Sequence, residues 1–122
     1  MRTFLACVLM CGTLIGLTGV ADAALYGAIA TSSTYPVVSY GYGVNARTLG
    51  AAEVVALAGC RAHTRYACYV RAWFAGPAVC GAVARFGTRQ GWGYARGIAA
   101  ARVLALRGAG GGVIVVTACN GY

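Results

Sequence analysis

The chain has 122 residues, 60% of them hydrophobic and 10% charged, and this length allows one domain with a modest core rather than several. All ten basic residues are arginine and only two residues are acidic, so the formal net charge is +8. Guanidinium groups without internal carboxylate partners surround the molecule with positive potential, which favours anionic partners over cationic ones.

The N-terminus predicts a secretory signal peptide. Arg2 precedes an apolar run over residues 4–20, and Ala21-Asp22-Ala23 has the small-x-small form of a cleavage site. A lone transmembrane helix is the alternative, but the run is short and no basic cluster follows it. We therefore expect cleavage near Ala23, secretion to the extracellular space or cell envelope, and one mature domain over residues 24–122.

The mature sequence contains two copies of one unit, over about residues 26–76 and 80–121. The matching segments are 27–30 with 81–84, 41–43 with 91–93, 52–59 with 101–108, and 68–76 with 113–121. Each copy has a short apolar strand, a strand alternating glycine with aromatic residues, an Ala-rich helix and a closing strand. The unit is ββαβ, so we predict an α+β fold of about six strands, with two helices packed on one sheet face.

The helices are expected at about 49–59 and 98–107, each ended by a glycine, Gly59 or Gly108. Thr48 can cap the first helix, and Gly97 holds the matching, looser position before the second.

Alternation along the closing strand of each copy predicts two faces. In the first copy residues 68, 70, 72 and 74 should lie under the helix, and Tyr69, Arg71 and Trp73 should lie on the opposite face. The same parity places residues 113, 115, 117 and 119 beneath the second helix.

Four cysteines remain in the mature chain: Cys60, Cys68, Cys80 and Cys119. In an exported chain an even set of this size favours two disulfides. The first two match Ala109 and Val113 in the second copy, and the last two match Tyr26 and Phe74 in the first. Because each pair is present or absent together, we predict bridges between residues 60 and 68 and between residues 80 and 119.

Several of these segments resemble a family of small secreted bacterial proteins, many of them actinobacterial, whose shared domain has no assigned function. The resemblance is carried by Tyr26–Ala30, the helix ending in Cys60, Cys68 leading to Ala72-Trp73-Phe74, residues 80–84, residues 91–94, and the closing run to Cys119. The chain departs from the family pattern in lacking a cysteine pair at Ala109 and Val113. The resemblance implies secretion and contact with a host or competitor, and it implies no reaction.

Groups for catalysis are few in the mature chain. It has one histidine, His63, one carboxylate side chain, Glu53, and no lysine, and no spacing indicates a triad of these two with Ser39. Residues 41–46 approach a dinucleotide fingerprint but lack the acidic residue about twenty positions later. The cysteine spacing matches no paired zinc pattern, although a site using Cys60 and His63 is a minor alternative. We predict no catalytic residue, cofactor or metal.

The predicted binding face is basic and aromatic, and it consists of Tyr69, Arg71, Trp73, Tyr42 and Trp92. If both helices cover one sheet face, these residues lie on the other beside residues 114, 116 and 118, and so apolar a face predicts a partner. Burial by loops or by the second copy is the other interpretation.

The first functional hypothesis is a secreted, non-catalytic binding module that acts at the cell envelope or on a host or rival cell. Stacking aromatic rings and arginine forks suit an anionic ligand: a glycan, a lipid headgroup or an acidic protein, with no specific nucleic acid. The second hypothesis is an inhibitor or effector that binds a protein target of a host or rival cell through loops 31–36 or 108–112. The third is a small hydrolase using His63.

Overall fold

The computed structural model describes residues 25–121, so the predicted signal peptide lies outside the described residues. Its elements are β1 (Tyr26–Ser32), β2 (Tyr40–Ala46), α2 (Leu49–Arg61), β3 (Cys68–Ala75), β4 (Val79–Phe86), β5 (Arg89–Arg96), α3 (Ile98–Ala109) and β6 (Val113–Cys119). The order ββαβ therefore occurs twice. The predicted α+β fold, with six strands, two helices and two disulfides in this part of the chain, is confirmed.

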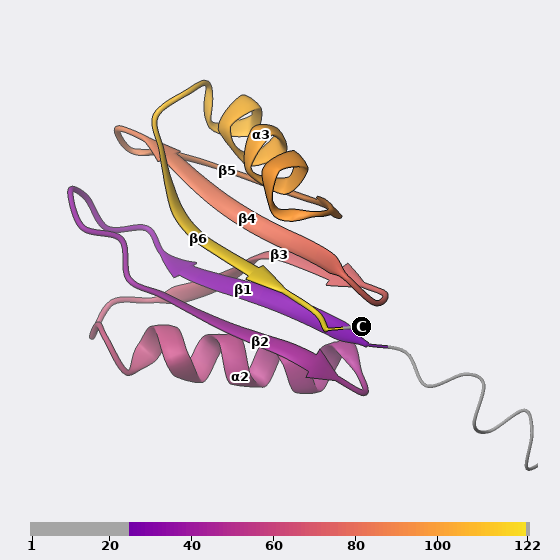
Figure 1. Ribbon diagram of the computed structural model, residues 1–122. Coiled ribbons are helices and arrows are strands. Elements are labelled where there is room, and N and C mark those ends of the chain that lie inside the picture. The colour runs from indigo at the N-terminus through magenta and orange to yellow at the C-terminus, as the bar shows by residue number, and fades with distance from the viewer. Residues whose placement is uncertain (1–24, 122) are drawn as a thin grey trace, which may run out of the picture.

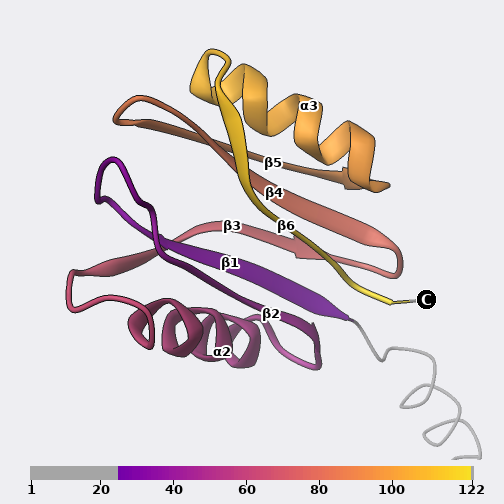
Figure 2. The ribbon, with the colours of Figure 1, turned by 60° about the vertical axis from the view of Figure 1, so that its left-hand side comes forward.

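The strands form two antiparallel three-stranded sheets, ordered β2-β1-β3 and β5-β4-β6. Each helix covers the outer face of its own sheet, and the two inner faces pack together with β2 opposite β6 and β3 opposite β5 (Figures 1 and 2). The expectation that both helices cover one face of one sheet is wrong. The inner faces carry the buried side chains Ile29, Phe74 and Val83, and two sheets bury these residues against each other.

Each helix lies close to the second strand of its half because glycine faces glycine. Gly41 of β2 approaches Gly59 of α2, Gly91 of β5 approaches Gly108 of α3, and a Cβ atom on either strand glycine would overlap the helix backbone. Gly59 and Gly108 therefore lie inside the helices and do not end them, contrary to the expectation from sequence. The helix α3 ends instead before Gly110, which has a left-handed φ of 87°.

A β-bulge in the closing strand of each half changes which side chains face the helix. In β3 the pairing with β1 shifts between Val70 and Ala72, so Arg71 is the extra residue, and Val115 has this place in β6. Before the bulge, Val70 packs toward α2; after it, Ala72 and Phe74 pack against the second sheet. The predicted strict alternation along both closing strands is wrong for this reason.

Both predicted disulfides are present. The bond Cys60–Cys68 joins the last turn of α2 to the start of β3, with the two Cα atoms 6.2 Å apart. The bond Cys80–Cys119 joins directly paired residues of β4 and β6, with Cα atoms 4.0 Å apart. Two disulfides in so small a domain indicate an oxidising, extracellular-type environment.

Phe74 occupies the centre of the interface between the sheets and is 1% exposed. Its ring fills the space that Cβ atoms on Gly27 and Gly81 would need. Tyr26 pairs with Ala75 at the position where the second half has its disulfide, so the predicted match of Phe74 with residue 119 is wrong by one residue. Both closing strands contain a bulge, at Arg71 and at Val115, and counting from each bulge matches Phe74 with Ala118.

Asn120 joins the end of the chain to the first half. It is 3% exposed, and its amide nitrogen donates to the carbonyl oxygens of Leu25 and Gly76. Its side-chain carbonyl oxygen accepts from the backbone N–H of Asn45 at 3.0 Å. The start of β1 and the end of β6 consequently lie at one corner of the molecule (Figure 1).

Candidate functional site

The open side of the two sheets where β3 faces β5 is here named the β3–β5 rim, and it is lined by Tyr69, Arg71, Gln90, Trp92 and Tyr94. The three β5 side chains point away from α3, because the alternate residues Gly91 and Gly93 face that helix. The three aromatic side chains are 50–60% exposed: Tyr69 52%, Trp92 50% and Tyr94 60%. The rim therefore presents aromatic rings to solvent at the seam between the sheets.

Arg71 lies at the centre of a polar network at the rim. Its Nε donates to the Thr31 hydroxyl at 3.2 Å and its Nη2 donates to the Ser33 hydroxyl at 2.5 Å. Thr31 in turn donates to the side-chain carbonyl of Gln90 at 2.6 Å, which links the two sheets. The guanidinium carbon also lies 5.0 Å from the centre of the Tyr69 ring. The hydroxyl groups and the ring that contact Arg71 carry no negative charge.

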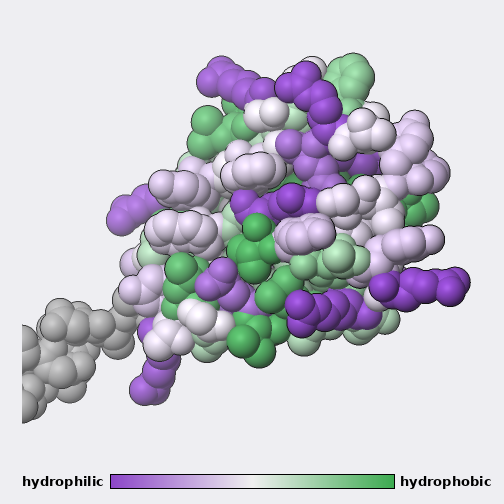
Figure 3. Space-filling view, turned by 180° about the vertical axis from the view of Figure 1, so that it is seen from behind, coloured by the Kyte–Doolittle hydropathy of each residue, from purple (hydrophilic) through white to green (hydrophobic). Residues whose placement is uncertain are grey.

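The whole surface is short of negative charge. Residues 25–121 contain nine arginines and one acidic residue, Glu53, so most guanidinium groups of this part of the chain have no side-chain carboxylate to pair with. Figure 3 shows the molecule from behind, where β3 and β5 lie in Figure 1. On this face strongly hydrophilic side chains, in purple, lie beside hydrophobic ones, in green. Pale side chains have intermediate hydropathy, and this class includes Tyr and Trp.

The five residues of the predicted binding face do not share one surface. Tyr69, Arg71 and Trp92 come together at the β3–β5 rim. Tyr42 lies on β2, at the opposite open side where β2 faces β6. Trp73 pairs with Ala28, which packs against α2, so Trp73 lies on the outer face of its sheet and is 54% exposed. The bulge at Arg71 separates Trp73 from Tyr69.

The sequence reasoning missed two rim residues, Tyr94 and Gln90, and the buried Thr31 that connects Arg71 to Gln90. The alternation of residues 91–94 places Tyr94 on the same side of the strand as Trp92, so the pattern contained this signal. No comparable signal exists for Thr31 and Gln90, because their contact joins residues 59 positions apart.

Ser39 and His63 lie close together beside a hollow of about 400 Å³. However, the Ser39 hydroxyl donates to the backbone carbonyl of His63 at 3.3 Å, and this bond does not activate the hydroxyl. Glu53 lies eight residues before the end of α2, about 12 Å along the helix axis, so it is badly placed to orient the His63 ring. The glycines of the dinucleotide-like segment lie within β2 and face α2.

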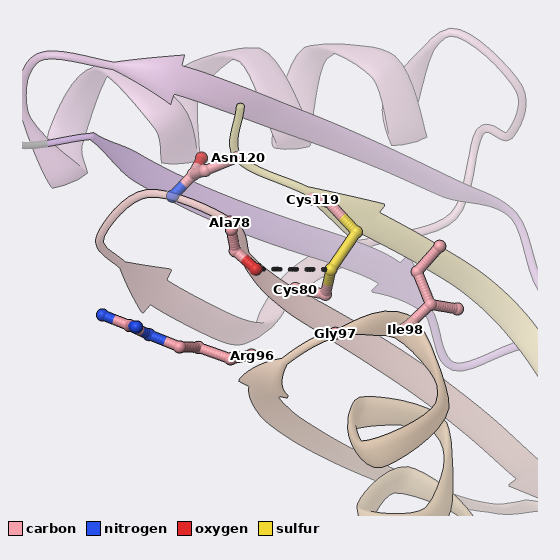
Figure 4. A pocket seen from close by; sticks show the side chains of 7 residues that line it. All are labelled: Ala78, Cys80, Arg96, Gly97, Ile98, Cys119 and Asn120. Carbon is pink, nitrogen blue, oxygen red and sulfur yellow. Dashed lines mark hydrogen bonds between the residues drawn. A yellow bond between two sulfur atoms is a disulfide. The ribbon is translucent and has the colours of Figure 1, made fainter. Parts of the chain in front are cut away.

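A hollow of about 480 Å³ lies beside the second disulfide, at the start of α3 (Figure 4). It is lined by Ala78, Cys80, Arg96, Gly97, Ile98, Cys119 and Asn120, of which Arg96 alone is charged. A lining with one cation and no carboxylate or histidine offers no acid–base pair.

The end of the first loop expected to contact a protein target lies beside the start of β6, which follows the second loop. A groove of about 310 Å³ lies between residues 36–38 and β6, and it includes Arg85 and Val113. The Arg85 guanidinium carbon is 5.8 Å from the centre of the Tyr35 ring. Val37 is 73% exposed and Val113 is 55% exposed, so this end carries exposed apolar side chains.

Within residues 25–121 no group of three or more His, Cys, Asp or Glu side chains is arranged to hold a metal ion. No helix in the described part of the chain combines the length and apolar composition that a membrane crossing requires.

The fold and its bridges define a small, disulfide-stabilised α+β module. Residues 26–119 match a family model described as a domain of unknown function (DUF4189), and the chain belongs to this family. No curated protein and no solved structure matches the chain.

Proposed function

We propose that the protein is a secreted, non-catalytic module that binds an acidic glycan at the β3–β5 rim. It acts at the cell envelope or on a host or rival cell. The observation that carries this proposal is the position of Arg71, which two hydroxyl groups hold in place beside the half-exposed ring of Tyr69. A planar guanidinium fork suits a carboxylate, and flat aromatic faces suit sugar rings.

The scarcity of acid–base groups supports a binding role over a catalytic one. Among residues 25–121, Glu53 and His63 are the only carboxylate and imidazole side chains, and the length of α2 separates them. Two disulfides and closely packed helices make the scaffold rigid, and a rigid scaffold holds a binding surface in place before its ligand arrives.

Titration of the oxidised protein with polygalacturonate tests the proposal, with neutral dextran as the control ligand. We expect binding to polygalacturonate that weakens strongly with added salt, and no binding to dextran. Arg71→Gln and Tyr69→Ala should each weaken binding by about tenfold, because they remove a charged contact and a stacking ring. Tyr42→Ala, on the opposite rim, is the matched control and should bind normally. Equal affinity of all three variants would contradict the assignment of the rim.

The apolar end of the molecule supports a second candidate function, inhibition of a protein target. The groove between residues 36–38 and β6 brings the exposed side chains of Val37 and Val113 together. A tight apolar contact is insensitive to salt, so a complex that persists at high salt and is lost in Val37→Ser would favour the inhibitor over the glycan-binding module.

A further inference from the structure

The outward face of α3 is apolar where a surface helix is ordinarily polar. Ala101, Ala105 and Ala109 face the sheet and are buried. Val103, on the side turned away from the sheet, is 45% exposed, and Leu104, whose Cβ lies beside Gly93 at the β5 edge, is 41% exposed. This helix therefore has apolar side chains on its inner and its outer side.

The strand β5 extends the apolar face of α3. Leu104 lines a hollow of about 520 Å³ together with Trp92 and Tyr94 of β5. Both aromatic side chains are at least half exposed, so the apolar surface continues from the helix onto the edge of the sheet.

Positive charge borders this surface. Arg107 follows Val103 by one helical turn, and Arg96 follows Tyr94 at the end of β5; both arginines are exposed. The one acidic side chain of residues 25–121, Glu53, lies on α2, beyond both sheets (Figure 2). A face that combines exposed aliphatic and aromatic side chains with arginines and no carboxylate is complementary to an anionic lipid surface.

We propose that the outer face of α3 and the edge of β5 dock on an anionic lipid bilayer. Leu104, Val103 and Trp92 enter the boundary between headgroups and acyl chains, and Arg96 and Arg107 contact lipid phosphates. A second copy of the chain is a poorer occupant, because a two-fold pairing of this face would bring Arg107 near its own counterpart. This inference goes beyond the proposed glycan binding, since it concerns another ligand and the helix α3, and the two surfaces share Trp92 and Tyr94 of β5.

The helix α2 provides a matched internal comparison. Its positions Val54, Val55 and Ala58 correspond to Val103, Leu104 and Arg107 of α3. Val54 and Val55 are 67% and 55% exposed, so this face is apolar as well. It has alanine in place of the arginine, and a glutamate one residue before Val54, so it lacks the charge that an anionic bilayer requires.

Co-sedimentation of the oxidised protein with vesicles tests the proposal. We expect binding to phosphatidylcholine vesicles that contain one third phosphatidylglycerol, little binding to pure phosphatidylcholine, and loss of binding at high salt. Arg107→Gln should weaken binding about fivefold, and Leu104→Ser about tenfold. Val55→Ser, the α2 counterpart, and Arg61→Gln, at the end of α2, should bind the vesicles as the unaltered protein does.

Fluorescence provides a second readout that does not depend on the stability of the Leu104 variant. In a Trp73→Phe protein, Trp92 is the one tryptophan, and its emission should shift to the blue on addition of the anionic vesicles. Absence of binding, equal binding to both vesicle types, or equal losses in Leu104→Ser and Val55→Ser would each overturn the proposal.

Discussion

The two halves of the molecule share the features that pack each helix on its own sheet. Both have the order ββαβ, a glycine contact between helix and second strand, and a bulge in the closing strand. They differ at the interface between the sheets, in the position of the disulfide, and on the outer face of the helices. The contacts that pack a helix on its own sheet are therefore the same in both halves. The two halves differ where they contact each other or the surroundings.

The largest of these differences is at Phe74. The corresponding residue in β6 is Ala118, since both follow their bulge by three residues. The ring of Phe74 reaches Gly27 of its own sheet and Gly81 of the other, so it occupies the space on both sides of the interface. A second ring at residue 118 would have no room.

Replacing Phe74 should lower the stability of the protein at least as much as removing either disulfide, and more than removing the helix cap. We expect Phe74→Ala to lower the free energy of unfolding by about 4 kcal/mol, measured by urea denaturation of the oxidised protein. Trp73→Ala, at the neighbouring exposed position, is the control and should cost less than about 1 kcal/mol. If the two variants were equally stable, Phe74 would not be the centre of the interface.

The disulfides should differ in their contributions to stability. The sequence separations are 39 for Cys80–Cys119 and 8 for Cys60–Cys68. In the chain-entropy model the longer loop contributes roughly 4 kcal/mol and the shorter about 2.5 kcal/mol. Urea denaturation of the two double alanine variants should therefore show the variant at residues 80 and 119 to be less stable by about 1.5 kcal/mol. The reverse order would show that packing around the first bridge outweighs loop length.

The smallest expected effect is at the start of the helices. The Thr48 hydroxyl accepts from the backbone N–H of Ala51 at 3.1 Å, whereas α3 begins after Gly97 with no side-chain cap. Thr48→Ala should cost about 1 kcal/mol and accelerate hydrogen exchange at the Ala51 amide. Thr88→Ala, in the exposed turn between β4 and β5, should change neither quantity. An unchanged exchange rate in Thr48→Ala would show that the cap is not formed in solution.

Local patterns in the sequence predicted the helices, the strands and the disulfides. The arrangement of the sheets and the positions of the bulges depend on long-range contacts. Alternating glycine and aromatic residues predicted β2 and β5, and paired presence and absence of cysteines predicted both bridges. The bulges at Arg71 and Val115 could not be predicted, because the residues around them continue an ordinary strand pattern. The predicted binding face consequently contained Trp73, which lies on the outer face of its sheet. It also lacked Tyr94, although the alternation of residues 91–94 contained the signal for this residue.

The position of Asn120 has a consequence for the connectivity of the chain. Its bonds to Leu25 and Gly76, together with the bond from the Ala78 N–H to the Gly121 carbonyl, bring Leu25, Gly121 and the link between the halves together at one corner. A short linker from Gly121 to Leu25, with a new opening near Ala78, would give a circular permutant in which the second half is synthesised first. Because every sheet is built within one half, no strand would change its partner, so the order of the halves along the chain is not dictated by the architecture.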